Sequence, residues 1–275
     1  MPKPNILSQS IHRELELTGL LGQDFQSQQI EDGGVVNTSY CLRANGRRYF
    51  MKTFESDDIA QLDRRALFAM QKTLSLGGKA SKPVYLSQAC DFQIDEWIEQ
   101  PTLDKSGLSM EDKIQLLAYV LADIHQQSLD APLLDLPCQW QHYLMQLNQV
   151  ISKEYKRELE QYGEYWYASC GDERVFCHND LSLKHVTQGE PVVIFDWEYC
   201  ALSSPYFDLA SCAQVNQLSD IQGKLLCHFY AQRTGRKTND IEAKMRLMTP
   251  LVNLTNKLWY QVADFTSGNN RQTGY

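Results

Sequence analysis

Residues 175–200, VFCHNDLSLKHVTQGEPVVIFDWEYC, combine two short apolar runs with several polar, titratable side chains, of which we single out five. They are His178, Asp180, His185, Asp196 and Glu198. Two carboxylates that lie close together repel each other unless a cation or a shared proton relieves them. Oxygen ligands of this kind suit Mg²⁺ on a nucleotide phosphate, and an Asp that stays off the metal can accept a proton from a substrate hydroxyl. The stretch therefore indicates a site for phosphoryl transfer or for metal-assisted chemistry.

The apolar runs beside these residues, RVFC and VVIFD, are rich in Val, Ile and Phe and fit buried strands. A Gly-Glu-Pro turn over residues 189–191 separates the second run from the segment before it. The polar residues then fall on a loop after one strand and at the end of another. At these places their carboxylates can converge on a metal or a substrate while the backbone stays rigid.

The first hundred residues have a mostly strand-like pattern. Two β-rich runs in TSYCLRANGRRYFMKTF flank the pair Asn45-Gly46, which is the strongest short signal for a hairpin. Apolar residues at helical spacing predict one helix over residues 57–74. Residues 82–98 predict two more strands around a turn at Cys90-Asp91. We expect an antiparallel sheet that carries one helix, with Lys52 near the end of the second hairpin strand.

Beyond Pro101 the pattern is helical. Ser109 and Asp112 fit a capping box at the start of a helix whose apolar positions are Ile114, Leu117, Leu121 and Ile124. The helical pattern continues over residues 140–155 and returns around residues 221–229 and 245–251. We therefore expect an α+β fold with two lobes, residues 1–98 and residues 99–275, joined by a hinge near residues 99–105.

The composition bears on partners and location. The 275 residues include 26 Lys and Arg against 34 Asp and Glu, and a net charge of -8 argues against nucleic acid, whose phosphates need clustered basic groups. We expect no membrane span, because apolar runs of about 18 residues are missing, and no cleavable leader. The eight cysteines show no C-x-x-C pair, so we expect thiols in a reducing compartment and a cytoplasmic protein.

The segment HNDLSLKH followed by VVIFDWEY resembles the catalytic loop and the metal-binding segment of the aminoglycoside phosphotransferase and choline kinase superfamily, usually H-x-D-L-x-x-x-N and then I-D-W/F-E. The resemblance implies a two-lobed protein-kinase-like fold that transfers the γ-phosphate of ATP to a small-molecule acceptor. It implies that Asp180 is the catalytic base, that Asp196 holds Mg²⁺ and that His178 orders the loop. The segment SPYFDLAS resembles the family segment in which an Asp, here Asp208, braces that loop.

Residues of the first lobe extend the resemblance. Lys52 resembles the lysine that grips the α and β phosphates of the nucleotide, and Asp63 occupies the helix position of the family Glu that pairs with that lysine. Gly33-Gly34 lies where the phosphate-covering turn is expected. The segment DEWIEQ resembles the connector between the lobes, which implies that the backbone of Glu96 and Ile98 hydrogen-bonds adenine.

One position departs from the family form. Where the family has an Asn whose oxygen reaches the metal, this chain has His185. A His supplies a nitrogen, which Mg²⁺ favours less and Mn²⁺ or Zn²⁺ favour more. His185 is thus a second candidate metal ligand beside Asp196. The change allows an altered metal preference that includes Mn²⁺, a one-metal mechanism, or lost activity.

The acceptor site is expected in the late helices and at the DWEY motif, which resembles choline, ethanolamine and thiamine kinases more than the shorter antibiotic-kinase form. Aromatic faces bind quaternary ammonium and thiazolium cations, so Trp259 and Trp197 are candidate acceptor residues. Glu198 offers a negative charge to the same cation. The acceptor is expected to be a small cation such as choline, ethanolamine or thiamine, with an amino sugar and the oligomeric state left open.

Two other functions stay open. A catalytically degenerate kinase would bind nucleotide or ligand without transferring phosphate, as the departure at His185 allows. A metallohydrolase would use His178, Asp180, His185 and Asp196 as ligands to Zn²⁺ or Mn²⁺. The metallohydrolase leaves Lys52 and the two-lobe pattern unexplained, so we rank it below the kinases.

Overall fold

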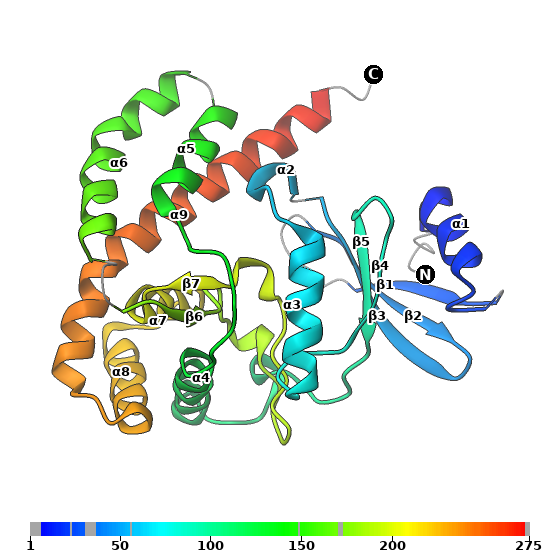
Figure 1. Cartoon of the computed structure of the whole chain (residues 1–275), viewed down its shortest axis with the longest axis horizontal. Helices are drawn as coiled ribbons and strands as arrows, with labels where there is room; N and C mark the ends of the chain where they lie inside the picture. Colours follow the sequence, from blue (N-terminus) through cyan, green and yellow to red (C-terminus); the bar gives the residue numbers. More distant parts are fainter. Residues whose placement is uncertain are drawn as a thin grey trace. The chain divides into compact units, whose positions relative to one another are not determined.

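A computed structural model describes residues 7–22, 24–30, 37–55, 57–147, 149–169 and 173–272 of the chain (Figure 1). The chain forms two compact units, Met1–Glu99 and Gln100–Tyr275, and the sequence analysis placed this boundary after residue 98. An antiparallel sheet with helices makes up the first unit, and helices dominate the second. This architecture confirms the predicted α+β class.

In the described residues, the first unit has a sheet of five strands in the order β1-β2-β3-β5-β4, each antiparallel to its neighbours. The strands are β1 Gln26–Ile30, β2 Ser39–Ala44, β3 Arg47–Thr53, β4 Pro83–Leu86 and β5 Phe92–Glu96. Asn45 and Gly46 join β2 to β3 with φ angles of 51° and 72°. A two-residue turn of this kind needs two positive φ angles, which Asn and Gly tolerate best, and the predicted hairpin is confirmed.

One face of this sheet packs into an apolar core. Leu42, Met51 and Ile94 are buried there with Leu15, which comes from helix α1, Gln9–Thr18. Burial of apolar surface of this kind is the main stabilising term for the unit. The face covered by α1 therefore serves the core.

The segment after the hairpin forms two helices, α2 over Asp57–Ala60 and α3 over Arg64–Leu76. Gln61 between them has a φ of 47°, in the left-handed region that a right-handed helix cannot enter. Asp63 then caps α3, because its Oδ1 accepts hydrogen bonds from two backbone N–H groups of the first turn at 3.1 and 3.0 Å. The prediction of one continuous helix here is wrong, since a left-handed residue and a cap separate the two helices.

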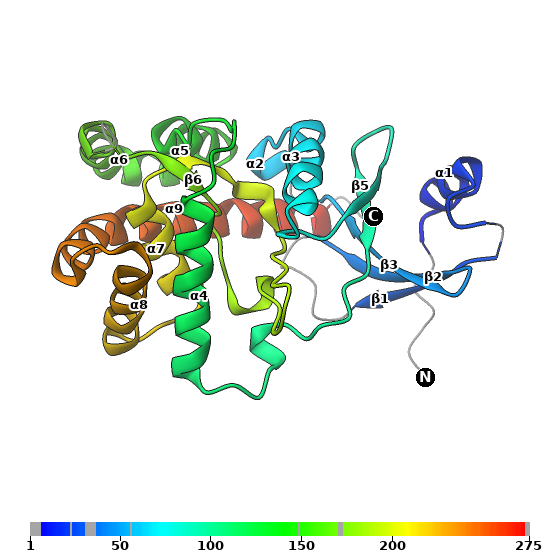
Figure 2. The ribbon, with the colours of Figure 1, turned by 60° about the horizontal axis from the view of Figure 1, so that its bottom comes forward.

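The other face of the sheet lies toward α3, and we call it the polar face because it carries Lys52, Gln93 and Asp95 beside Cys41 and Phe50. Successive side chains of a strand point to opposite faces, so Phe50 and Lys52 point away from the core face that Met51 joins. Gln71 of α3 donates a hydrogen bond to Asp95 of β5, which places α3 over this polar face. Both ribbon views show α1 and α3 on opposite sides of the sheet (Figures 1 and 2).

The described part of the second unit contains α4 Met110–His125, α5 Leu136–Gln146, α6 Gln149–Ser169, α7 Pro205–Val215, α8 Asp220–Thr234 and α9 Thr238–Gln272. α4 packs along α8, and α7 packs along α9 (Figure 2). Ser109 caps α4, where its hydroxyl accepts from the Asp112 N–H at 3.2 Å. The predicted start of this helix is confirmed, and its four predicted apolar positions are buried: Ile114, Leu117, Leu121 and Ile124.

The helical pattern over residues 140–155 is interrupted. α5 ends at Gln146, and the next residue, Leu147, is extended with a φ of -91° and a ψ of 159° before α6 begins at Gln149. The prediction of one continuous register is wrong here, because apolar spacing does not report a local change of backbone direction.

A small sheet and one bridge organise the segment that carries the polar residues. β6, Val175–Cys177, pairs with β7, Ala201–Ser203. The run VVIFD, predicted as a strand, makes an isolated bridge between Ile194 and Val186 instead. That bridge brings the end of the run beside the loop that follows β6.

The structure describes most of the cysteines, and its helices can be compared with those that cross membranes. The described cysteines are all free thiols: Cys41, Cys90, Cys138, Cys177, Cys200, Cys212 and Cys227. Among the helices that the structure describes, none combines the length and the apolar character needed to cross a membrane.

Candidate active site

Asp208 of α7 holds the loop that follows β6. Its carboxylate is fully buried and accepts hydrogen bonds from the backbone N–H groups of His178 and Asn179, both at 2.8 Å. Nε2 of His125, on α4, lies 3.1 Å from the same carboxylate. Burial alone would raise the pKa of Asp208, but the hydrogen bonds and the attraction of His125 and His178 hold this pKa below its usual value. These contacts support the bracing role expected of Asp208.

His178 is built into the loop. Its Nε2 lies 2.9 Å from the carbonyl oxygen of Phe195, and its Nδ1 lies 3.3 Å from the backbone nitrogen of Asp180. A carbonyl only accepts and a backbone N–H only donates, so the ring proton is on Nε2. Burial, followed by repulsion from His185, lowers the pKa of His178 to about 4, and the ring is neutral at neutral pH. Because both nitrogens are engaged, His178 is not available as a metal ligand, which counts against the metallohydrolase.

Two polar side chains that the sequence analysis did not single out fix the rest of the loop. Ser211 of α7 donates to the carbonyl of Asn179 at 2.7 Å. Asn216, at the end of α7, accepts from the Leu183 N–H at 2.7 Å and donates to the carbonyl of Leu181 at 3.0 Å. Their polar character within an apolar helix was the available signal. Asp180 thus projects from a backbone that is held on both sides.

His185 and Asp196 lie beside each other at the end of this loop. Nδ1 of His185 lies 2.8 Å from the carbonyl oxygen of Asp180, so Nδ1 carries the proton and donates. Nε2 faces Asp196, whose Oδ2 is 3.6 Å away. Asp196 itself has a left-handed backbone, with a φ of 62° and a ψ of 54°. Strained backbone of this kind clusters at functional sites, because surrounding structure must hold it.

The pair fits a divalent cation. Metal–ligand distances of about 2.1 Å place neighbouring ligand atoms about 3 Å apart, so small movements let Nε2 of His185 and a carboxylate oxygen of Asp196 share one ion. Both side chains are partly exposed, at 18% and 31%, which leaves room for phosphate or water as further ligands. The nitrogen makes the set more suitable for Mn²⁺ than an all-oxygen set is.

A second group of ligand-type residues, His125, Cys177 and Asp208, has its ligand atoms within 4.8 Å of one another. The carboxylate and one imidazole nitrogen already bond to each other, and the other nitrogen of His125 lies 2.8 Å from the hydroxyl of Tyr230. Burial raises the pKa of Cys177, which keeps it a thiol. We therefore assign this group to the brace of the loop and not to a metal.

Aromatic and acidic side chains act on the hydroxyl of Tyr199. The indole N–H of Trp259, on α9, donates to the hydroxyl of Tyr199 at 3.0 Å. Burial, and then the charges of Glu198, Tyr143 and Asp180, raise the pKa of Tyr199. The hydroxyl of Tyr199 thus bonds to one predicted residue, Trp259, and lies within the electrostatic reach of two others, Glu198 and Asp180. Tyr199 and Tyr143 were missed, although Tyr199 follows Glu198 directly in the DWEY motif.

The structure corrects one acceptor candidate, Trp197. Its side chain is only 5% exposed and stacks on Phe176 with the ring centroids 5.9 Å apart. Its indole N–H donates to the carbonyl of Ile194 at 3.0 Å. The short 3₁₀ turn Trp197–Tyr199, which follows the left-handed Asp196, directs this ring into the core, where it cannot reach an acceptor.

The pairing that the resemblance implied between Asp63 and Lys52 stays a prediction. Lys52 stands on β3 opposite Gln93 of β5, on the polar face of the sheet. The described contacts of Asp63 are with the first turn of α3, where its Oδ1 caps the helix. The predicted Gly33-Gly34 turn lies outside the described residues.

The predicted adenine contacts fall at the end of β5. The backbone N–H of Glu96 donates to the carbonyl of Lys82 at 2.9 Å, and the Glu96 carboxylate pairs with the Lys82 ammonium at 3.2 Å. A contact between Glu96 and adenine would therefore use the carbonyl of Glu96. Ile98 lies just beyond the strand and is half-buried.

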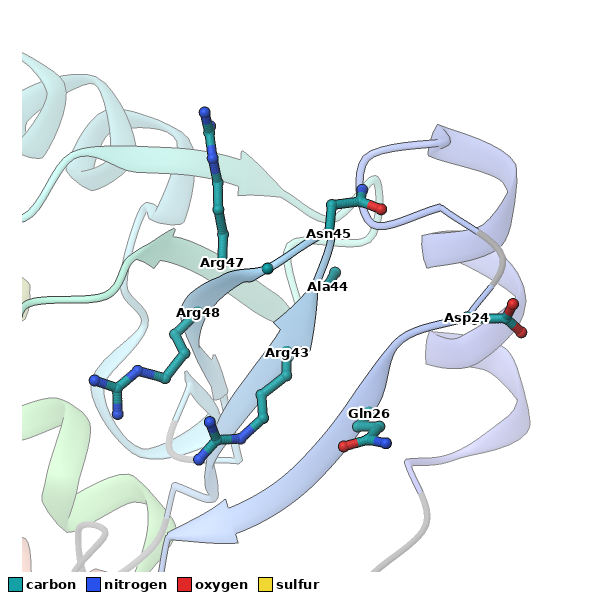
Figure 3. A pocket seen from close by; sticks show the side chains of 8 residues that line it. Asp24, Gln26, Arg43, Ala44, Asn45, Arg47 and Arg48 are labelled. Atoms are coloured by element: carbon teal, nitrogen blue, oxygen red, sulfur yellow. The ribbon is translucent and has the colours of Figure 1, made fainter.

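A hollow of about 310 Å³ lies at the tip of the β2–β3 hairpin (Figure 3). Arg43 and Arg48 face each other across the two strands and extend to the same side, whereas Arg47 extends to the other. Arg48 also forms an ion pair with Glu99, and its guanidinium lies 5.0 Å from the centre of the Trp97 ring. The residues predicted from the sequence do not line this hollow, so we keep it apart from the candidate site.

The family model described as the phosphotransferase enzyme family matches residues 28–246. No protein of curated function matches the sequence. The fold is similar to that of choline kinase LicA from Streptococcus pneumoniae, with a TM-score of 0.70 and 17% identity over 96% of both chains. An ethanolamine kinase from Plasmodium vivax gives a TM-score of 0.71 and 13% identity over 95% of this chain and 85% of that one. Spectinomycin phosphotransferase, in complex with ADP and spectinomycin, gives a TM-score of 0.56 and 16% identity over 92% of this chain and 89% of that one.

Fold and family together define a small-molecule phosphotransferase with a protein-kinase-like architecture. Because the family match covers most of its length, the chain belongs to the phosphotransferase enzyme family. The family inferred from the two motifs around Asp180 and Asp196 is confirmed.

Proposed function

We propose that the chain transfers the γ-phosphate of ATP to the hydroxyl of a small cationic amino alcohol of the choline, ethanolamine or thiamine type. The observation that carries this proposal is that Trp259 bonds to the hydroxyl of Tyr199 while the charges of Glu198 and Asp180 act on the same hydroxyl. Carboxylates and aromatic faces together stabilise a cation, and a carboxylate can also accept the proton of its hydroxyl. The similarity to choline and ethanolamine kinases supports this acceptor class.

Each unit contributes a separate part of the proposed reaction. In the first unit, Lys52 neutralises charge on the ATP phosphates, and backbone groups of Glu96 and Ile98 bind adenine. In the second unit, His185 and Asp196 would hold Mg²⁺ or Mn²⁺, and the ion would neutralise charge on the phosphates.

Asp180 orients the acceptor hydroxyl and takes its proton as the oxygen attacks the γ-phosphorus and the bond to the β-phosphate oxygen breaks. Ser211, Asn216 and Asp208 hold the loop that carries Asp180, so the carboxylate needs little reorganisation. Positioning and electrostatics then supply most of the catalysis. The free thiols fit a reducing compartment, and we place the protein in the cytoplasm.

The test is transfer of labelled γ-phosphate from ATP to choline, ethanolamine, thiamine and an aminoglycoside, with Mg²⁺ and with Mn²⁺. Asp180→Asn is expected to lower turnover by at least about a hundredfold while ATP binding is kept, because the base is lost and the nucleotide contacts are not. Asp130→Asn, at an exposed acid, is the matched control and is expected to keep full turnover.

A labelled amino alcohol that disappears with Asp180→Asn supports the proposal. A labelled aminoglycoside alone would keep the kinase and overturn the acceptor class. ATP binding without any labelled product would favour the degenerate kinase, and normal turnover by Asp180→Asn would remove Asp180 as the base.

A further inference from the structure

A buried carboxylate lies on the Lys52 face of the sheet. Asp95 of β5 is only 9% exposed and comes two residues after Gln93, the cross-strand partner of Lys52. Side chains two residues apart on a strand share a face, and diagonal neighbours of an antiparallel pair lie within reach of a long side chain. The charges of Asp95 and Lys52 therefore act on each other across this face.

Three neutral side chains fix the Asp95 carboxylate. Gln71 of α3 donates to Oδ2 at 2.9 Å, and Gln93 donates to Oδ1 at 2.7 Å. The hydroxyl of Ser81 lies 3.4 Å from Oδ2, and Gln93 also donates to Gln71 at 2.7 Å. The network sets the direction of the carboxylate without cancelling its charge. A buried charge is costly unless it is compensated, so a cation is needed nearby.

Lys52 is the cation whose attraction reaches this carboxylate. Burial raises the pKa of Asp95 to about 6, while the hydrogen bonds and the attraction of Lys52 oppose this rise. The side chains that bond to Asp95 from α3, β5 and the segment before β4 are neutral, and Lys82 is paired with Glu96. Asp95 is thus mostly ionised at neutral pH, and the Lys52 on the same face of the sheet attracts its charge.

We propose that Asp95 is a positioning residue for Lys52, a fixed negative charge that holds the ammonium on the face where the ATP phosphates are gripped. Asp95 takes the role that the resemblance assigned to an acidic residue on the helix after the hairpin, which was expected to pair with Lys52. The described contacts of Asp63 are instead with the first turn of α3, which it caps. The inference rests on the proposed function, since that function assigns Lys52 to ATP.

The test compares Asp95→Asn with the wild type by calorimetric titration of ATP between pH 5 and pH 8. At pH 8 the ATP dissociation constant of the variant is expected to be about tenfold higher, the factor that one pKa unit of coupling represents. We compare the ratio of the ATP dissociation constant of the variant to that of the wild type. Below pH 6 the wild-type carboxyl is protonated, so both proteins are neutral at this position and this ratio falls toward one. A merely structural role would give a ratio that does not change with pH, and the titration of ATP itself cancels in the ratio.

Two further proteins sharpen the test. Asp91→Asn makes the same chemical change on the β4–β5 turn, where Asp91 bonds to Ser87, and its ratio is expected to stay near one at every pH. Gln71→Glu combined with Asp95→Asn moves the acid from β5 to α3 within the same hydrogen-bonded pair. This double variant is expected to regain most of the ATP affinity at pH 8.

A ratio of one for Asp95→Asn at pH 8 overturns the inference, and so does a ratio that is constant with pH. A double variant that binds ATP no better than Asp95→Asn overturns it as well. Wild-type protein that does not bind ATP at any pH overturns the proposed function instead, so the two failures are distinguishable.

Discussion

Nδ1 of His185 donates a hydrogen bond to the carbonyl of Asp180 at 2.8 Å, and this contact determines which ring nitrogen faces Asp196. The backbone of the proposed base thus orients a proposed metal ligand. Nε2, when unprotonated, presents its lone pair toward the Asp196 carboxylate. Metal binding and base positioning are therefore connected through one imidazole ring.

His185→Asn is expected to shift metal preference toward Mg²⁺, because it replaces a nitrogen ligand with an amide oxygen. The ratio of the Mg²⁺ to the Mn²⁺ dissociation constant, measured by calorimetry with ADP present, should fall by at least about tenfold. Changes to the groups around a bound metal typically alter its affinity by about 10- to 100-fold. His228→Asn, at an exposed position on α8, is the control and should leave the ratio unchanged. An unchanged ratio for His185→Asn would remove His185 as a ligand.

Asp208→Asn is expected to destabilise the protein at pH 7 by about 1–3 kcal/mol, because one buried donor loses its acceptor. The folded-state pKa of Asp208 is lowered, so its contribution is full above the ordinary Asp pKa and is lost as pH falls through the lower folded value. Urea unfolding from pH 7 down to pH 3 should therefore show a difference from wild type that shrinks in acid. Asp123→Asn, at a half-exposed acid paired with Arg233, should cost less than about 1 kcal/mol. A difference for Asp208→Asn that does not change with pH would contradict the ionised brace.

Asp95→Asn is expected to have the opposite effect on stability. The pKa of Asp95 rises from 3.8 to about 6 on folding, so the folded state binds the proton more tightly than the unfolded chain does. Wild-type stability should then fall as pH rises from 3.8 to about 6 and stay at the lower value above this range. Above pH 6 the neutral Asn should raise the free energy of unfolding by up to about 3 kcal/mol. Thermal unfolding at pH 4 and pH 8 checks this, and a gain of equal size at both pH values would contradict it.

Replacement of Trp259 is expected to weaken binding of the acceptor and to leave binding of the nucleotide unchanged. A cation–π contact of about 0.5–2 kcal/mol corresponds to an acceptor KM that rises about 2- to 30-fold in Trp259→Ala. Trp259→Phe keeps an aromatic face but loses the N–H that bonds to Tyr199, so its acceptor KM should rise less. Initial rates with each substrate varied in turn provide the measurement. A rise in the KM for ATP of the same size would show a general disturbance of the fold.

Features that depend on neighbouring residues could be predicted from the sequence. The turn at Asn45-Gly46 needs only two residues that accept positive φ, and the cap at Ser109 needs only one hydroxyl before a helix. The resemblance of two motifs assigned Asp180 to the catalytic loop and Asp208 to the brace of that loop, because a sequence motif specifies the local backbone along with its residues. These predictions held without knowledge of distant contacts.

Features that depend on pairing or on single dihedral angles could not be predicted. Asp95 meets the charge of Lys52 only through the register between β3 and β5, which no local pattern specifies. Gln61 ends a helix through a positive φ, although the apolar spacing continues past it. Trp197 is directed inward by the turn that begins at it, and its residue type alone fits a core or a binding site equally well.

The left-handed backbone of Asp196 makes alanine a misleading replacement at that position. An alanine pays a conformational penalty of about 1–2 kcal/mol in this region, whereas Asn and Asp accept it more readily. Asp196→Ala would therefore alter the path of the chain and the charge at once, and lost activity would not identify the cause. Asp196→Asn keeps the path and the side-chain shape and removes only the charge. Asp196→Asn tests the loss of the charge. Asp196→Gly accepts the same left-handed backbone and tests the loss of the whole side chain.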